Sequence, residues 1–253
     1  MAARDSFERK MAKVIWENRW KNFSAFDDWI DHHFCREGAA VFAREHCVFA
    51  RHFPRWFGAM ISNCPEMDVR QYMIDNMYVE EVKDPSISTG HYESMVNFGV
   101  ALGLDRRFLN EYEGAVYTRV CLAYWDRASR AWTWLEAFAA VAGLEGARGP
   151  LVAKIGRTRP MNWNVWARLG LKGKKAMEHW EAADEADAPV GGHGDVCLKI
   201  LARYADTAEK RERVLKILAE SMQVRWFHFD SIGREAIAAS GGAGGRRRAK
   251  AAA

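Results

Sequence analysis

The sequence predicts an all-α protein, and three observations support that prediction. Long segments carry apolar residues at spacings of three and four, which is the period of an amphipathic helix. Glycine, proline, asparagine and aspartate separate these segments, as is typical of helix ends. No segment alternates apolar and polar residues as a half-buried strand does. We therefore expect helices along the whole chain and no sheet.

The predicted helices follow one another with short connections. In chain order they cover residues 6–20, 24–36, 38–51, 56–63, 66–82, 90–103, 112–143, 146–157, 172–187, 194–205 and 208–238. The last is the clearest, because Leu215, Leu218, Met222 and Phe229 keep helical spacing along it. Residues 83–90 (KDPSISTG) and 188–192 (APVGG) are rich in turn residues and are predicted loops.

Several helix ends have a chemical cause that can be read in the sequence. Pro65 stands at the start of the helix over 66–82, where its missing N–H leaves no hydrogen bond unmade. Gly103 ends the helix over 90–103, since glycine tolerates the left-handed conformation common after a helix. Asp206 precedes the last helix and can accept hydrogen bonds from its first backbone N–H groups.

Composition and charge exclude several classes of protein. Of 253 residues, 49% are hydrophobic and 28% are charged, which is typical of a folded globular chain. No apolar run approaches the roughly 18–20 residues of a membrane span, and the first residues do not resemble a secretory signal. We therefore expect a cytoplasmic protein without a membrane partner. The net charge of +4 comes from the tail residues Arg246, Arg247, Arg248 and Lys250, so the body offers no basic face to nucleic acid.

We expect a single helical domain over residues 1–239 and a disordered basic tail over residues 240–253. The tail, SGGAGGRRRAKAAA, has too few apolar side chains to offset the entropy of ordering it. The cysteines form no CxxC pair, so their pattern indicates neither a zinc ribbon nor a disulfide framework. Reduced thiols are the expected state.

Three ionisable residues lie where the apolar stripe of a predicted helix continues. Glu81, His91 and Glu145 each extend the inward stripe of their own helix. An ionisable group on such a stripe needs a partner, and helical bundles build di-iron and di-manganese sites from inward carboxylates and histidines. Other interpretations stay open. Glu80 competes with Glu81 because it extends a methionine stripe of the same helix, His91 can be a capping or core residue, and Glu145 can be solvated.

Two segments of the chain resemble pyrroloquinoline-quinone synthase and its relatives. The first contains ISNCPEMDVRQYMIDNMYVEE and, after a loop, GHYESMVNFGVALGL; the second is HGDVCLKILARYADTAEKRERVLKILAESMQVRWFHFDSI. The resemblance covers about residues 35–238. It implies the haem-oxygenase-like helical bundle of about seven main helices, which thiaminase II and non-haem di-iron oxidases share. It also implies a homodimer.

The iron enzymes of the superfamily that this chain resembles carry a Glu, a His about ten residues later, and a Glu on a following helix, often with Pro five residues after it. Glu81, His91, Glu145 and Pro150 match these positions. The resemblance thus implies that Glu81, His91 and Glu145 are metal ligands.

The fourth element of the superfamily pattern, His-x3-Asp-x2-His, is altered in this chain. Without a gap, Trp180, Asp184 and Asp187 occupy its three positions. If APVGG is an insertion, Asp187 and His193 stand for the Asp and the second His. Both alignments lack the first histidine, and His179 points about 140° away from Asp184 on an ideal helix. Asp184, Asp187 and His193 are therefore the candidates for the remaining metal ligands, with a solvated acidic helix face as the alternative for the two aspartates.

Two rival activities and one non-catalytic function remain open. Metal-free oxidation of the quinone-synthase kind is disfavoured, because the histidine-rich turn of that family is replaced here by VEEVKDPSISTG. A thiaminase II mechanism would require a cysteine nucleophile, and neither Cys121 nor Cys197 lies in a matching motif. The third possibility is a protein that binds a small ligand in the same cavity without reaction.

The function that the sequence favours is that of a non-haem iron-dependent oxidase or oxygenase that uses O2 on a small biosynthetic metabolite. The expected cofactor is Fe(II), as one ion or a di-iron pair, with O2 as co-substrate. Tyr117, Tyr124 and His228 are the expected wall of an aromatic substrate pocket. The expected partners are the small-molecule substrate and a second copy of the chain.

Overall fold

A computed structural model describes residues 2–19, 24–156, 163–180 and 192–251, and every regular element in these ranges is a helix. The expected all-α fold is confirmed. In chain order the helices are α1 (Ala2–Asn18), α2 (Ala25–His32), α3 (Arg36–Ile61), α4 (Met67–Glu81), α5 (His91–Ala101), α6 (Arg106–Glu111), α7 (Val116–Ala131), α8 (Trp134–Val141), α9 (Gly143–Gly146), α10 (Pro150–Gly156), the 3-10 helices η1 (Trp163–Leu169) and η2 (Lys174–Ala176), α12 (His193–Tyr204) and α13 (Ala208–Ala251).

α3 is a single long helix where the sequence pattern predicts two, over 38–51 and 56–63. Pro54 lies inside it, and an interior proline removes a backbone hydrogen bond at a cost of ~3 kcal/mol. The neighbouring side chains of Phe53, Trp56 and Phe57 are all buried in the core. Because each such burial stabilises the fold by roughly 1.5–3 kcal/mol, the packed side chains outweigh the lost bond.

The helix predicted over 112–143 is divided into α7, α8 and α9. α7 begins only after Gly114, whose φ of 91° lies in the left-handed region that favours glycine. At its other end Trp132 is extended, and the backbone N–H and hydroxyl of Thr133 both donate to Glu136 in a capping box that starts α8. This Thr-x-x-Glu pattern is present in the sequence. The apolar periodicity continues on both sides of it, however, and therefore predicts one helix instead of two.

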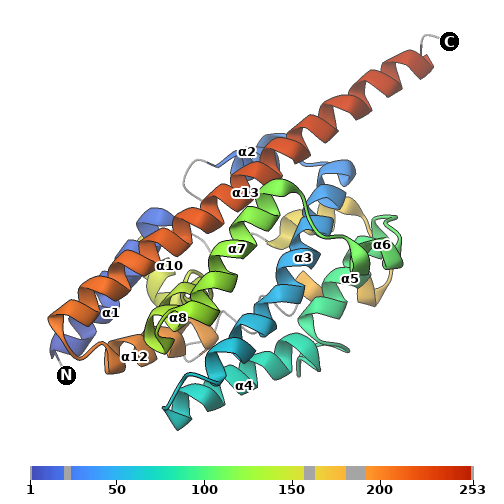
Figure 1. Ribbon diagram of the computed structural model, residues 1–253. Coiled ribbons are helices and arrows are strands. Elements are labelled where there is room, and N and C mark those ends of the chain that lie inside the picture. Colours follow the sequence, from blue (N-terminus) through green and yellow to red (C-terminus); the bar gives the residue numbers. More distant parts are fainter. Residues whose placement is uncertain (1, 20–23, 157–162, 181–191, 252–253) are drawn as a thin grey trace.

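α3 lies at the middle of the bundle. It packs against α4 and α5 and also against α7, α8 and α13, an arrangement that can be followed in Figure 1. α13 is the longest helix and lies along α1, α2, α7 and α8. The core between these helices is strongly aromatic, and its almost completely buried side chains include Trp29, Trp56, Trp125 and Trp166.

The C-terminal end of α13 projects beyond the other helices, as Figure 1 shows. The composition of the tail predicts disorder from residue 240, whereas the structure continues the backbone as helix to Ala251. That the tail is independent of the folded body stays a prediction. Within the described residues, no helix combines the length and the apolar character that a membrane span requires.

Candidate functional site

A small cavity lies among α3, α4, α5, α9 and the segment around residue 179. Its volume is about 40 Å³, and since a water molecule needs about 10–15 Å³ of such space, a few waters or an ion with small ligands would fill it. α3 contributes an aromatic wall and His46, and the other elements contribute the remaining ionisable groups. The lining residues are His46, Phe49, Ala50, Phe53, Glu80, His91, Glu145, Arg148 and His179.

α4 directs Glu80 into the cavity and leaves Glu81 exposed. Glu80 follows the buried Met73 and Asn76 at seven and four residues, so it lies on the same helix face. The apolar residues that suggested Glu81 form a different stripe, and Ile74, at 53% exposure, lies on it at the surface. The helix has two apolar faces, and the sequence pattern alone does not distinguish the inward one.

His91, the first residue of α5, is held between two carboxylates. Its Nδ1 is 3.0 Å from Glu80 Oε1, and its Nε2 is 2.5 Å from Asp84 Oδ2. Burial acts to lower the pKa of His91, but the charge on Glu80 and the hydrogen bond to Asp84 outweigh it and raise that pKa to about 10. The imidazole is therefore a cation that donates from both nitrogens. Gly90 allows this approach, because a Cβ there would lie 2.7 Å from the Glu80 carbonyl oxygen.

His179 also faces the cavity, and it is neutral. Its Nδ1 is 3.0 Å from Ser94 Oγ, whose own hydrogen is donated to the His91 carbonyl oxygen at 2.7 Å. The hydroxyl oxygen therefore accepts from His179 Nδ1, which leaves a lone pair on Nε2. Burial, followed by the charge on His91, holds the pKa of His179 well below its usual range.

His179 is not among the ligands predicted from the sequence, because on an ideal helix its side chain points away from that of Asp184. The structure shows no long helix before this residue: η2 ends at Ala176, and helical backbone resumes only at residue 178. Asp184 and Asp187 lie outside the described residues. No apolar stripe marks His179 in the sequence, so only the folded arrangement brings it to the cavity.

His46 of α3 is the second cavity residue that sequence reasoning missed. It is 7% exposed, and its ring stacks on Phe42 and Phe49 at centroid distances of 5.0 and 5.8 Å. Burial and the nearby charge of Arg225 hold the pKa of His46 well below its usual range, so the ring is neutral. Its position on a strongly apolar helix face could have indicated a buried imidazole, but not its neighbours.

The remaining candidate ligands divide between the cavity and its surroundings. Glu145 of α9 lines the cavity together with Arg148. His193 is the first residue of α12, where its ring meets Tyr72 edge-on at 6.2 Å and its carbonyl accepts from the Tyr72 hydroxyl. Tyr72 lies eight residues before Glu80 on α4, about 12 Å along the helix axis. His193 is not among the residues that line the cavity.

The cavity residues fit iron by the chemistry of their donors. Carboxylate oxygens and neutral imidazole nitrogens are both iron ligands, and Glu80, Glu145, His46 and His179 supply them around one space. Among the described residues, no three histidine, cysteine, aspartate or glutamate side chains converge closely enough to hold a metal ion as they stand. His91 does not offer a free nitrogen to such a group, because Glu80 and Asp84 bind both of its ring nitrogens.

The three residues expected to form the substrate pocket do not line this cavity. Tyr117 donates to Glu235 of α13, and Tyr124 lines a separate surface groove between α7 and α13. His228 is fully buried and bonded to Thr118 at 3.0 Å. The aromatic residues that line the cavity are Phe49 and Phe53 of α3.

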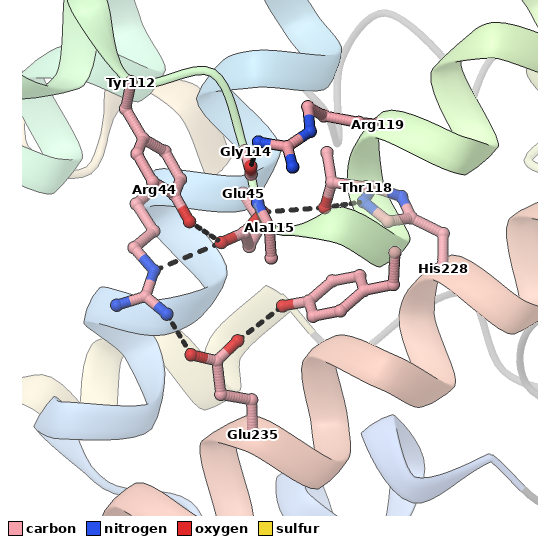
Figure 2. Close-up of polar contacts among 10 residues, drawn as sticks. Arg44, Glu45, Tyr112, Gly114, Ala115, Thr118, Arg119, His228 and Glu235 are labelled. Atoms are coloured by element: carbon pink, nitrogen blue, oxygen red, sulfur yellow. Dashed lines mark hydrogen bonds and ion pairs between the residues drawn. The ribbon is translucent and has the colours of Figure 1, made fainter.

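A second polar cluster is centred on the buried carboxylate of Glu45 (Figure 2). Glu45 accepts hydrogen bonds from the Tyr112 hydroxyl, the Ala115 N–H and the Thr118 hydroxyl, and it also pairs with Arg44. A buried carboxylate with this many donors is electrostatically satisfied. The cluster joins α3 to α7 and leaves Glu45 no capacity for a ligand.

The cysteines give no support to a thiaminase-like nucleophile. Burial raises the pKa of the Cys121 thiol to about 12 and raises that of Cys197 well above its usual range. Since the thiolate is the nucleophilic form, both side chains are unreactive where they lie. Neither lines the cavity.

A family model described as "Iron-containing redox enzyme" matches residues 40–226 of this chain. The chain belongs to this family of iron-containing redox enzymes. The matched region runs from α3 into α13 and includes every residue that lines the cavity. A search of curated protein sequences gives no match.

Solved structures with the same fold confirm the haem-oxygenase-like architecture. A TenA homolog from Pseudomonas syringae pv. tomato aligns with a TM-score of 0.68 at 14% identity, over 91% of this chain and 92% of that one. A domain of unknown function with a heme oxygenase-like fold from Shewanella denitrificans aligns with a TM-score of 0.65 at 14% identity, over 88% and 89%. A TenA homologue from Pyrococcus furiosus aligns with a TM-score of 0.58 at 14% identity, over 91% and 99%.

Proposed function

We propose that this protein is a non-haem iron-dependent oxidase or oxygenase that uses O2 on a small biosynthetic metabolite in the cytoplasm. The observation that carries the proposal is the meeting of Glu80, Glu145 and His179 at one cavity, although they lie far apart in the sequence. Membership of a family of iron-containing redox enzymes supports it. The five free thiols agree with a reducing compartment.

Glu80 and Glu145 would hold the iron through carboxylate oxygens, and His179 through the lone pair on Nε2. Asp184 and Asp187, on sequence grounds, are candidates for further ligands. When bound, iron supplies the one- and two-electron chemistry with O2 that side chains lack. One ion or a di-iron pair is compatible with this donor set.

The chain's own residues would prepare the site in two ways. Phe49, Ala50 and Phe53 give the cavity an apolar wall that excludes water and lowers the local dielectric constant. His91 orients the Glu80 carboxylate from one side, and the hydrogen bond from its other nitrogen to Asp84 holds the preceding loop in place. Ser94 would keep the proton of His179 on Nδ1, so that Nε2 keeps its lone pair.

The test is the iron content of the protein after anaerobic addition of Fe(II) and removal of unbound metal. We expect one or two irons per chain and O2 consumption that depends on them. His179→Ala should lose the iron, whereas His33→Ala, which changes an exposed histidine, should keep it. Wild-type protein without iron would refute the proposal; O2 turnover would then indicate metal-free oxidation, and its absence a ligand-binding protein.

A further inference from the structure

His46 differs from the other two histidines of the cavity in its hydrogen bonding. Both nitrogens of His91 are bonded to carboxylates, and Nδ1 of His179 is bonded to Ser94. Nδ1 of His46 is buried, and no group among the residues that the structure describes forms a hydrogen bond with it. A buried polar nitrogen without a partner loses its hydration and gains nothing in return, so native structures rarely retain one without a cause.

Packing does not explain why this position is a histidine. The ring lies nearly parallel to Phe42 and to Phe49, with interplanar angles of 17° and 18°. A phenylalanine would make the same stacking contacts without burying a nitrogen. The two phenylalanine rings do, however, restrict the plane of the imidazole, which is the kind of support that a metal ligand requires.

His46 lies within reach of an ion that His179 would bind. The two ring centroids are 5.8 Å apart. Two imidazoles bound to one ion at metal–nitrogen distances of about 2.1 Å have ring centroids at most about 6.4 Å apart, so the observed spacing is compatible with a shared ion. The rings belong to α3 and to the segment after η2, and they enter the cavity from different elements.

We propose that His46 is a further ligand of the metal ion in this cavity, bound through a ring nitrogen. It supplies the second imidazole, which His91 does not supply while Glu80 and Asp84 hold both of its nitrogens. The donor set becomes Glu80, Glu145, His179 and His46, two carboxylates and two neutral imidazoles. The inference rests on the proposed function, because it concerns the same metal centre.

The experiment compares cobalt(II) binding by two variants with phenylalanine on the same helix. His46→Phe keeps the stacking on Phe42 and Phe49 and removes the nitrogen donors. His52→Phe is the matched control, because Nδ1 of His52 is bonded to the Val48 carbonyl and the residue does not line the cavity. Cobalt(II) is the probe, since its visible absorption spectrum reports the number and type of its ligands and is read in the absence of turnover.

Loss of a residue that only supports a ligand lowers metal affinity 10–100-fold, so loss of His46 itself should lower it by about 100-fold or more. His52→Phe should bind as the wild type does. In His46→Ala, added imidazole should occupy the space left by the side chain and restore the wild-type cobalt spectrum, a result that a purely structural role would not produce. Circular dichroism establishes that each variant is folded, and His46→Gln replaces any variant that is not.

Two results would overturn the inference, and they are distinguishable. If His46→Phe binds cobalt as the wild type does while His179→Ala does not, the metal centre exists and His46 only packs. If the wild type itself binds neither cobalt nor iron, the proposed function fails and the inference fails with it.

Discussion

Nδ1 of His91 lies 3.0 Å from Oε1 of Glu80, so the first residue of α5 is bonded to the last turn of α4. The ten residues between them form the end of α4 and a loop, and Asp84 of that loop binds the other nitrogen of His91. This single imidazole therefore joins two helices and their connection at the edge of the cavity.

The bond predicts a dependence of stability on alkaline pH in the metal-free protein. The pKa of His91 is raised in the folded state to about 10, above its usual value of 6.5. Its stabilising contribution is therefore complete below pH 6.5 and is lost as the pH rises through about 10. In urea unfolding, the wild type should have a much larger free energy of unfolding than His91→Gln at pH 6. The difference between the two proteins should be smaller at pH 10. An equal difference at both pH values would contradict the imidazolium.

Glu80 and Glu81 form a matched pair for testing which face of α4 carries the ligand. Glu80→Gln should lower iron affinity at least 10-fold, since an amide is a weaker donor than a carboxylate. Glu81→Gln should change it less than 2-fold, because Glu81 is exposed and lies off the cavity. Anaerobic titration with Fe(II) measures both affinities, and the reverse order of effects would show that Glu81, not Glu80, is the ligand.

Gly233 and Gly241 of α13 should respond to alanine with opposite signs. A Cβ at Gly233 would lie 2.1 Å from the Phe26 backbone nitrogen, so Gly233→Ala must separate α13 from α2 and should destabilise the fold by about 1–3 kcal/mol or more. At Gly241, no described residue places an atom within 4 Å of such a Cβ. Gly241→Ala should be neutral or stabilising by up to about 1 kcal/mol, from helix propensity alone. Thermal unfolding of both variants measures the contrast.

Thr118 connects two buried groups, and its hydroxyl should contribute to stability without affecting metal binding. It donates to Glu45 at 2.7 Å and lies 3.0 Å from Nε2 of His228. Thr118→Val keeps the shape of the side chain but removes one hydrogen bond from Glu45 and one from His228. We therefore expect the free energy of unfolding to fall by about 1–3 kcal/mol. The control is Glu111→Gln, which removes an exposed ion pair with Arg107. This substitution should lower the free energy of unfolding by less than about 1 kcal/mol. Unchanged stability of Thr118→Val would show that the cluster relaxes around the missing hydroxyl.

We also expect the chain to form a homodimer, as the family resemblance implies. Exposed apolar side chains on α4 are available for burial in an interface: Met67, Ile74, Tyr78 and Val82. Light scattering at micromolar concentration should give a mass near twice 28.8 kDa. A mass near 28.8 kDa would show that these side chains stay exposed to solvent.

The cavity residues differ in how far the sequence predicts them. His91 and Glu145 extend apolar stripes, and both line the cavity, because the period of a helix relates such residues to its buried face. Glu80 was one of two choices, since α4 carries apolar residues on two faces and only the position of α3 shows which face is inward. His46 and His179 have no comparable signal, because they lie far apart in the sequence and only the packed helices bring their rings together.

The sequence by itself determined the all-helical fold, the positions of most helices and the family, because these depend on local spacing and on motifs within single segments. The tertiary structure decided whether Pro54 interrupts α3, which face of α4 is buried and which histidines meet. Each of these outcomes is a balance between a local preference and contacts with distant residues. Such contacts form only when the helices pack, and so periodicity along one helix does not specify them.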